Sequence, residues 1–309
     1  MQFSSITTKN KLMTIKFNYT HKFLLVILAA STLLTACKKD DNEITEAEQE
    51  AVIRPVTAQS NIYVTQLISY NPAPGQLINT STGSPDAAKT ILGTKGLVCL
   101  GAFGGSIVLG FDHTVLNQDN KEDLMIYGNA FAGFAEPGVV WVMQDKNSNG
   151  LADDTWYELT GSAQGTAGLT RNYAITYTRP AAATSDVSWT DNQGGSGTVK
   201  TNVYHKQAYY PEWITANTYT LNGTLLPTIN IDSTNPNNVK SNAFAFGYAD
   251  NTSGGDKVDI SNAIDAQGNK VILNGIDFVK IQTGIPYNLG ALGELSTEVS
   301  GVADLSLIK

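Results

Sequence analysis

The stretch "SIVLGF" at residues 106–111 places its three largest apolar side chains, Ile107, Leu109 and Phe111, at every second position. Successive side chains of an extended strand point to opposite faces, so these three share one face. The stretch "NYAITYT" at residues 172–178 has the same period. Its shared face consists of Tyr173, Ile175 and Tyr177. Both stretches therefore predict half-buried β-strands.

Similar short runs, rich in Val, Ile, Tyr, Thr and Trp, continue outward from these two and are separated by Gly, Asn, Asp and Pro clusters. The further runs are "GLVCLGA", "DLMIYGN", "GVVWVMQ", "TWYELTG", "TYTLNGTLL", "NAFAFGYA", "DFVKIQTG" and "LSTEVSG". No long segment has helical periodicity, and no fixed-period repeat indicates a propeller or solenoid. The pattern predicts an all-β fold: one large β-sandwich or jelly-roll-like domain with long loops over residues 61–309.

The N-terminal segment has the features of a lipoprotein signal peptide. Basic residues up to Lys22 precede the apolar run "FLLVILAASTLLTAC" at residues 23–37, which is short for a membrane-spanning helix. The end of this run, "LLTAC", resembles a lipobox, which predicts a signal peptide at residues 1–36 and lipidation of Cys37. The alternative is an ordinary signal peptide with a chance cysteine. Residues 37–60 then form the lipidated end and a flexible tether.

Charge and cysteine content limit the classes of partner. The formal charge is −8, and removal of residues 1–36, which carry four lysines and no acid, makes it −12. Such an acidic chain repels phosphate backbones, so we expect no nucleic-acid partner and contact with the membrane only through the lipid anchor. With Cys37 lipidated, the remaining Cys99 has no disulfide partner and is expected to be a small buried core residue.

Several segments together resemble a family of Bacteroidetes cell-surface lipoproteins. They are residues 101–162, "WTDNQG", "YYPEW", "FGYADN", "DAQGNKVILNGIDFVKIQTG" and "LGELSTEVSG". Separately, "KKDDNE" behind Cys37 resembles the acidic export tag of Bacteroidetes surface lipoproteins, and the alternative is a solvated linker next to the anchor. The family is labelled only as cell surface protein and often occurs near TonB-dependent transporters and β-propeller lipoproteins. The resemblance implies an outer-membrane lipoprotein that faces the cell exterior. It also implies capture or display in nutrient uptake, with a carbohydrate or corrinoid as the ligand and a TonB-dependent transporter as a partner.

The segment "DKNSNGLADDTW" at residues 145–156 resembles the first half of a calcium-binding loop, D-x-[DN]-x-[DN]-G. Position twelve, where an EF-hand has a bidentate Glu, is Trp156, and strand-like runs flank the segment, so it is not an EF-hand. It could be a Ca²⁺ loop between two strands, or a polar hairpin turn around Asn149 and Gly150. The expected calcium ligands are Asp145, Asn147, Asn149, the carbonyl of Leu151, Asp153 and Asp154.

Two other acidic segments are weaker candidates. In "DAQGNK", Asp265 has no carboxylates downstream, which indicates a plain turn. In "YADNTSGGDKVD", Asp250, Asp256 and Asp259 could meet at a cation, although a solvated loop is the alternative.

Aromatic residues form the second candidate site. Trp189, Tyr204, Tyr209, Tyr210 and Trp213 lie in "VSWTDNQGG" and "YHKQAYYPEW", and flat rings on loops can stack on sugars or on a macrocycle. The proline of the second segment indicates that this segment is not a central strand. The alternative is that the rings close one end of the sandwich.

Enzymatic function has little support in the sequence. Outside the signal segment only His113 and His205 occur, which argues against a His-rich zinc site, and His113 fits a structural role better. No nucleophile elbow, phosphate loop or dinucleotide fingerprint is present. A glycosidase requires two carboxylates, and the candidates are Glu136, Glu158, Glu294 and Glu298. On one extended strand, Glu294 and Glu298 would lie about 13 Å apart, beyond the catalytic separation.

The sequence therefore predicts a surface-exposed, non-enzymatic lipoprotein that captures a carbohydrate or corrinoid for outer-membrane uptake, with Ca²⁺ as a stabilising ion. A glycoside hydrolase and an adhesive or structural surface protein are the alternatives.

Overall fold

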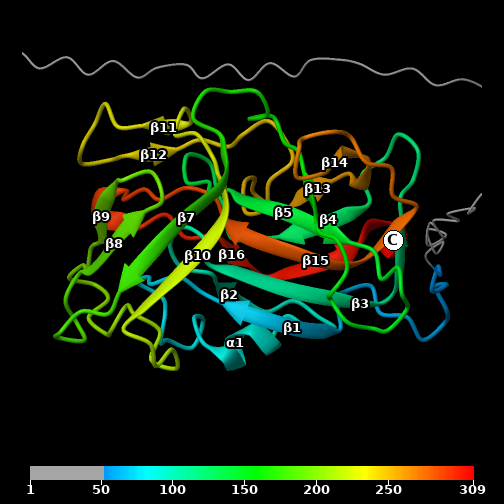
Figure 1. Cartoon of the computed structure of the whole chain (residues 1–309), viewed down its shortest axis with the longest axis horizontal. Coiled ribbons are helices and arrows are strands. Elements are labelled where there is room, and N and C mark those ends of the chain that lie inside the picture. Colours follow the sequence, from blue (N-terminus) through cyan, green and yellow to red (C-terminus); the bar gives the residue numbers. More distant parts are fainter. Residues whose placement is uncertain (1–51) are drawn as a thin grey trace, which may run out of the picture. The chain divides into compact units, whose positions relative to one another are not determined.

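The computed structural model describes residues 52–309, and nearly all of its regular elements are antiparallel strands (Figure 1). The expected all-β, sandwich-like fold is therefore confirmed. The expected signal peptide, Cys37 and the tether up to residue 51 lie outside the described residues. No helix within residues 52–309 has the length and apolar character of a membrane-spanning segment.

The largest sheet has six strands in the order β1-β3-β15-β5-β6-β14. Its strand β3 (Ser106–Leu116) contains the opening "SIVLGF" stretch, and Ile107, Leu109 and Phe111 are fully buried on one face, as expected. The other strands are β1 (Gln66–Asn71), β5 (Gly138–Met143), β6 (Tyr157–Leu159), β14 (Ala263–Ile264) and β15 (Gly275–Thr283). The central β15 pairs with β3 on one side and with β5 on the other, so it lies in the interior of the sheet.

A second layer packs on this sheet and completes the main core. It consists of the three-stranded sheet β13-β4-β17 and the strand pair β16-β2, with the one-turn helix α1 (Pro85–Lys89) packed beside them. The bounds of its strands are β2 (Val98–Cys99), β4 (Leu124–Tyr127), β13 (Asp256–Val258), β16 (Glu298–Val299) and β17 (Gly301–Asp304). Buried side chains from both layers form one cluster, in which each large aliphatic residue contributes about 1.5–3 kcal/mol.

A four-stranded sheet, β10-β7-β8-β9, covers a second core, which is rich in aromatic residues. Its strand β7 (Thr170–Thr178) buries Tyr173, Ile175 and Tyr177 on one face, so the expected alternation of "NYAITYT" is confirmed. The other strands are β8 (Val187–Asp191), β9 (Ser196–Val199) and β10 (Thr218–Leu225). The remaining elements are the pair β11 (Ile231–Asp232) and β12 (Lys240–Ser241) and the short 3₁₀ turns η1 (Ile260–Asn262), η2 (Gly290–Leu292) and η3 (Leu305–Leu307).

One predicted strand is wrong. The run "NAFAFGYA" at residues 242–249 forms a loop, because the side chain of Asn251 bonds both the N–H and the carbonyl of Phe244 in place of a strand partner. Gly247 has a φ of 92°, and a Cβ at this position would approach the Cα of Gly161 to 2.4 Å. Only glycine fits such a backbone, so the chain bends here.

Arg54, which lies before the expected start of the domain at residue 61, contacts two strands of the six-stranded sheet. The N–H of Arg54 donates to Thr114 Oγ1, its carbonyl accepts from the N–H of Thr114, and its guanidinium pairs with Asp277 Oδ1 at 2.8 Å. Arg54, within the segment expected as a tether, is therefore held against β3 and β15 by a pairing that the alternation of apolar residues does not reveal.

Candidate functional site

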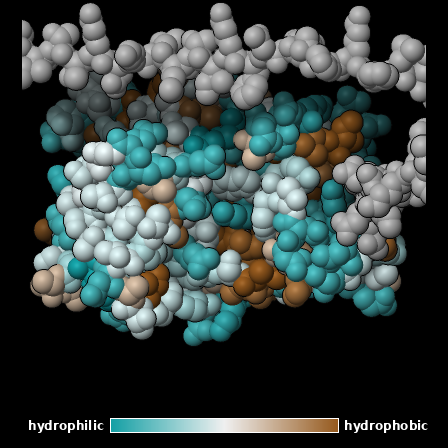
Figure 2. Space-filling model, in the orientation of Figure 1, coloured by the Kyte–Doolittle hydropathy of each residue, from teal (hydrophilic) through white to brown (hydrophobic). Residues whose placement is uncertain are grey.

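A pocket of about 490 Å³ combines exposed apolar side chains with a carboxylate floor. Phe131, Tyr204 and Leu292 at its rim are 60, 74 and 50% exposed, whereas Glu298 at its floor is buried. The lining residues are Gln76, Leu77, Asn129, Phe131, Phe134, Glu136, Tyr204, His205, Leu289, Ala291, Leu292 and Glu298. On the face drawn in Figure 2, by comparison, hydrophobic residues form small separate patches among hydrophilic ones.

Asp250 joins the three chain segments at the floor of this pocket. Its Oδ1 accepts from the N–H groups of Asn129 and Ala130, and its Oδ2 accepts from the N–H of Glu298, all at 2.8 Å. Its carbonyl accepts from the N–H of Glu136 at 2.9 Å. These bonds hold segments far apart in the sequence in one place, which makes Asp250 the organising residue of the site.

The backbone around Asp250 is shaped for this contact. Asp250 has a φ of 50°, in the left-handed region that few residues other than glycine adopt. A Cβ on Gly128 would lie 2.2 Å from Asp250 Oδ1, so only glycine allows the carboxylate to approach. Strained backbone of this kind persists where the surroundings fix it, and it often accompanies functional sites.

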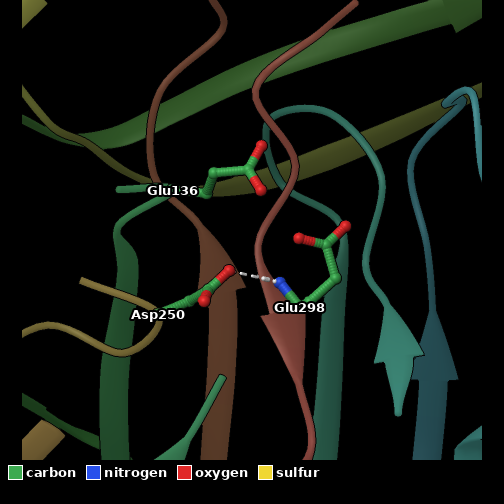
Figure 3. A group of neighbouring side chains, drawn as sticks. All are labelled: Glu136, Asp250 and Glu298. Carbon is green, nitrogen blue, oxygen red and sulfur yellow. Dashed lines mark hydrogen bonds between the residues drawn. The ribbon is translucent and has the colours of Figure 1, made fainter. Parts of the chain in front are cut away.

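Glu136 and Glu298 face each other above Asp250 (Figure 3). Ligand oxygens of the three carboxylates all lie within 4.8 Å of one another. Glu136 Oε1 accepts from the N–H of Ser296, and Glu298 Oε1 interacts with the hydroxyl of Ser296. Glu298 Oε2 is buried and has no hydrogen-bond partner among the described residues. The floor is thus a group of acceptors with one oxygen left unsatisfied.

Burial is the main influence on these groups. It raises the pKa of Glu136, Asp250 and Glu298, and the charge of Glu136 raises the pKa of the other two further. No Lys or Arg is among the described residues that line the pocket. Adjacent buried carboxylates cannot all be ionised unless a cation compensates their charge. Without a cation, at least one of them binds a proton.

The spacing of the pair bears on glycoside hydrolysis. Ligand oxygens of Glu136 and Glu298 lie within 4.8 Å of each other, whereas glycosidase carboxylates stand about 5 Å or more apart. Of the other candidates, Glu158 on β6 pairs with Arg171 on β7 at 2.9 Å. Glu294 lies before β16, the strand that begins at Glu298. The extended strand expected between Glu294 and Glu298 is therefore not formed, and the arrangement does not favour a glycosidase.

The 145–154 loop is closed by its own hydrogen bonds. Asp145 accepts from the N–H of Asn149 through Oδ1 at 3.1 Å and from the N–H of Gly150 through Oδ2 at 2.8 Å. Ser148 and Gly150 have positive φ values of 56° and 74°. The N–H of Asp145 also donates to the buried Asp277, which fixes the loop to the central strand.

The remaining expected calcium ligands also engage one another. Asp153 accepts from the side-chain amides of Asn147 and Asn149, Asp154 accepts from the N–H of Lys146, and the N–H of Leu151 donates to Asn149. Within residues 52–309, the three acidic side chains that come close enough to share a metal ion are Glu136, Asp250 and Glu298, and none of them belongs to this loop. The loop is thus a self-bonded polar turn, and its calcium stays a prediction.

The five expected aromatic residues do not share one surface. Tyr209 and Tyr210 are 0 and 2% exposed, and their hydroxyls donate to the carbonyls of His205 and Ala216. Trp189 packs against the same aromatic core, and Trp213 stacks on Tyr70 with ring centroids 6.1 Å apart. Tyr209 and Tyr210 therefore lie in the core and do not form part of an exposed surface. Tyr204 alone reaches the rim of the pocket.

Other sequence-based expectations have clear outcomes. His113 is buried between Asp112 and Asp304, at 2.6 and 3.1 Å, so it is a structural histidine, as expected. Cys99 is a buried free cysteine, also as expected, and burial raises the pKa of its thiol to about 12.

The acidic loop segments also differ from one another. Asp265 accepts from the N–H groups of Gln267 and Asn269, which confirms the plain turn. Asp250, Asp256 and Asp259 do not meet, because Asp256 bonds Asn251 and Asp259 caps η1, whereas Asp250 joins Glu136 and Glu298.

The sequence reasoning missed Phe131 and Phe134. Their rings lie 4.7 Å apart in a turn where the N–H of Phe134 donates to the carbonyl of Phe131. The signal was the density of Phe, Gly and Glu in "GNAFAGFAEPG", a segment without strand alternation. It also missed a second cavity, of about 370 Å³, lined by Trp141, Trp156 and Lys280 among others.

Comparison with models of known protein families found no match, and comparison with curated proteins found none either.

Proposed function

We propose that the chain is a surface-exposed lipoprotein that captures a nutrient ligand in the carboxylate pocket, for uptake through an outer-membrane transporter. The observation that carries the ligand-binding part is the pocket itself, in which the exposed Phe131 and Tyr204 stand over the acceptors Glu136 and Glu298. Small-molecule sites characteristically combine an apolar wall with a few convergent polar groups. The surface location rests on the apolar run that ends at Cys37 and on the resemblance to Bacteroidetes lipoproteins.

A carbohydrate is the ligand class that this chemistry favours. Sugar rings present C–H faces that stack on aromatic rings, and their hydroxyls donate to carboxylates. Phe131 and Tyr204 supply the rings, Glu136 supplies a polar group at the floor, and the exposed Asn129 supplies another along the lining. A pocket of about 490 Å³ is within the range of small-molecule sites and suits one or two sugar units. A corrinoid is larger and would rest on the rim.

Isothermal titration of the full chain with glycans and with cobalamin tests the ligand class. Replacing Tyr204 or Phe131 by Ala should weaken ligand binding by roughly tenfold, since each change removes one stacking ring. The matched control is Trp156→Ala, which removes a ring from the second cavity and should leave the affinity unchanged. If the control lost affinity by roughly tenfold and the pocket variants lost none, the ligand would bind in the second cavity instead.

The same titration separates the alternatives. Release of shorter sugars from a polysaccharide would identify a glycoside hydrolase. No heat with either class of ligand, together with a protein partner recovered by cross-linking on intact cells, would identify an adhesive or structural role.

Labelled fatty acid tests the anchor. The wild type should incorporate the label, Cys37→Ala should not, and protease added to intact cells should degrade the wild type. A protein that takes up no label, or that added protease does not reach, contradicts surface capture.

Calcium at the 145–154 loop completes the proposal. The Asp/Asn spacing supports it, and the carboxylates keep lone pairs beyond those used by the N–H donors of Asn149 and Gly150. A chelator should then weaken ligand binding without unfolding the domain, because the ion would stiffen a loop before binding. An affinity and a melting temperature that are both unchanged by chelator would exclude this role.

A further inference from the structure

The carboxylate cluster at the pocket floor lacks a compensating charge. Glu136, Asp250 and Glu298 offer ligand oxygens within 4.8 Å of one another, and no Lys or Arg is among the described residues that line the pocket. Asp250 is neutralised in part by three backbone N–H groups, but the N–H donors available to Glu136 and Glu298 are fewer. The two glutamates are therefore the acceptors of the cluster with the least compensation when they are ionised.

One oxygen of the cluster has no partner. Glu298 is 2% exposed, and its Oε2 makes no hydrogen bond within the described part of the chain. Its carboxylate turns toward that of Glu136 (Figure 3). Ionised carboxylates only accept hydrogen bonds, so Glu136 cannot satisfy this oxygen unless a proton or a cation lies between them. A buried polar atom without a partner costs about 1–3 kcal/mol, which a bound ion would recover.

The donor atoms indicate the kind of cation. All three converging groups are carboxylates, which are hard oxygen ligands suited to calcium, magnesium or manganese. Cys99 faces Glu298 across the β2–β16 pair, and its sulfur interacts with the hydroxyl of Ser296. Its sulfur is not among the ligand atoms that converge at the cluster, which are all carboxylate oxygens.

We propose that Glu136, Asp250 and Glu298 bind one hard divalent cation at the floor of the pocket. Asp250 Oδ2 accepts one bond from the N–H of Glu298 and keeps a lone pair for the ion. Three carboxylates fill only part of a coordination sphere of six or more oxygens. The remaining positions would be taken by water or by the hydroxyls of a ligand in the pocket.

This site shares the pocket with the proposed ligand but does not depend on it, because the cation is measured without any ligand. The full chain is stripped of metal with a chelator and then titrated with Ca²⁺, Mg²⁺ and Mn²⁺ by calorimetry. The double variant Glu136→Gln and Glu298→Gln should bind one cation fewer than the wild type. Each single variant should weaken that site by roughly a hundredfold, since affinity follows ligand charge.

A matched control separates this site from the 145–154 loop. Asp153→Asn changes an exposed carboxylate of that loop and should leave the cation of the pocket floor in place. The metal-free double variant should also be at least as stable as the metal-free wild type, because it removes repulsion between adjacent carboxylates. A cation should raise the melting temperature of the wild type but not that of the double variant.

Two results would overturn the proposal. One is an equal number of bound cations in the wild type and the double variant, and the other is no binding by the wild type at about 1 mM, the weak end for extracellular sites. If the double variant does not fold, Glu136→Gln alone and anomalous diffraction from wild-type crystals with Mn²⁺ decide. A peak between Glu136 and Glu298 supports the site, and its absence refutes it.

Discussion

Glu294 should make the stability of the domain depend on pH in a way that one substitution removes. Its Oε1 accepts from the N–H of Gln76 at 2.6 Å, whereas its Oε2 is buried without a partner among the described residues. Burial raises the pKa of Glu294 from 4.5 to about 8, and the charge of Glu136 adds to this rise. The pKa of Glu294 is higher in the folded state than in the unfolded state. Its contribution to the stability of the fold is therefore complete below pH 4.5 and is lost as the pH rises through about 8.

The magnitude follows from the two pKa values. The shift from 4.5 to about 8 is about 3.5 units, and at about 1.4 kcal/mol per unit it corresponds to about 5 kcal/mol. Between about pH 5 and about pH 8, the free energy of unfolding of the wild type should fall by roughly 3–4 kcal/mol relative to that of Glu294→Gln. The amide of the variant has its own cost of about 1–3 kcal/mol, because its buried N–H₂ lacks a partner, but this cost does not vary with pH.

Urea unfolding of both proteins at a series of pH values measures this difference. The control is Glu122→Gln at an exposed position, whose difference from the wild type should stay within about 0.5 kcal/mol across the series. A difference between the wild type and Glu294→Gln that stays constant with pH, or that changes in favour of the wild type as the pH rises, would refute the reasoning.

Three further predictions concern the framework of the site. Arg54→Ala should lower the free energy of unfolding in urea by about 1–3 kcal/mol. The loss is smaller than the roughly 3–5 kcal/mol of a fully buried pair, because Arg54 is 35% exposed while Asp277 is buried. No change in this free energy would mean that the pair does not form. Ile281→Ala, at a fully buried position of β15, should cost about 2–5 kcal/mol in urea unfolding and Ile281→Val about 0.5–1.5 kcal/mol; equal costs would contradict close packing there. Gly128→Ala should lower the melting temperature and abolish cation binding, since its Cβ would lie 2.2 Å from Asp250 Oδ1; a variant that binds the cation as the wild type does would show that the contact is not required.

The strands could be predicted where burial leaves a period in the sequence. In "SIVLGF" and "NYAITYT" every second side chain enters a core, so the alternation was visible without a structure. The loop at residues 242–249 also has large apolar side chains at alternate positions, but Asn251 bonds the backbone of Phe244 in place of a strand partner. A hydrogen bond between one side chain and one backbone group leaves no periodic trace, which is why this strand was predicted wrongly.

The members of the candidate site were visible in the sequence, but their grouping was not. Glu136 and Glu298 were considered as carboxylates and Asp250 as an acidic loop residue, in three separate contexts. They meet because Asp250 bonds the backbone of Glu298, 48 residues away, and of Asn129, 121 residues away. No spacing rule covers such contacts. Tyr209 and Tyr210 show the converse, since their hydroxyls find buried carbonyl partners that composition does not reveal.

The link from Arg54 to Asp277 has a mechanical consequence if the chain is anchored at its N-terminal end. A pull on the tether reaches Arg54 before it reaches β1, which lies at the edge of the six-stranded sheet. The guanidinium passes this load to Asp277 on β15, and the backbone of Arg54 passes it to Thr114 on β3. Tension is thus shared between two interior strands, and the edge strand is shielded from being peeled away under flow.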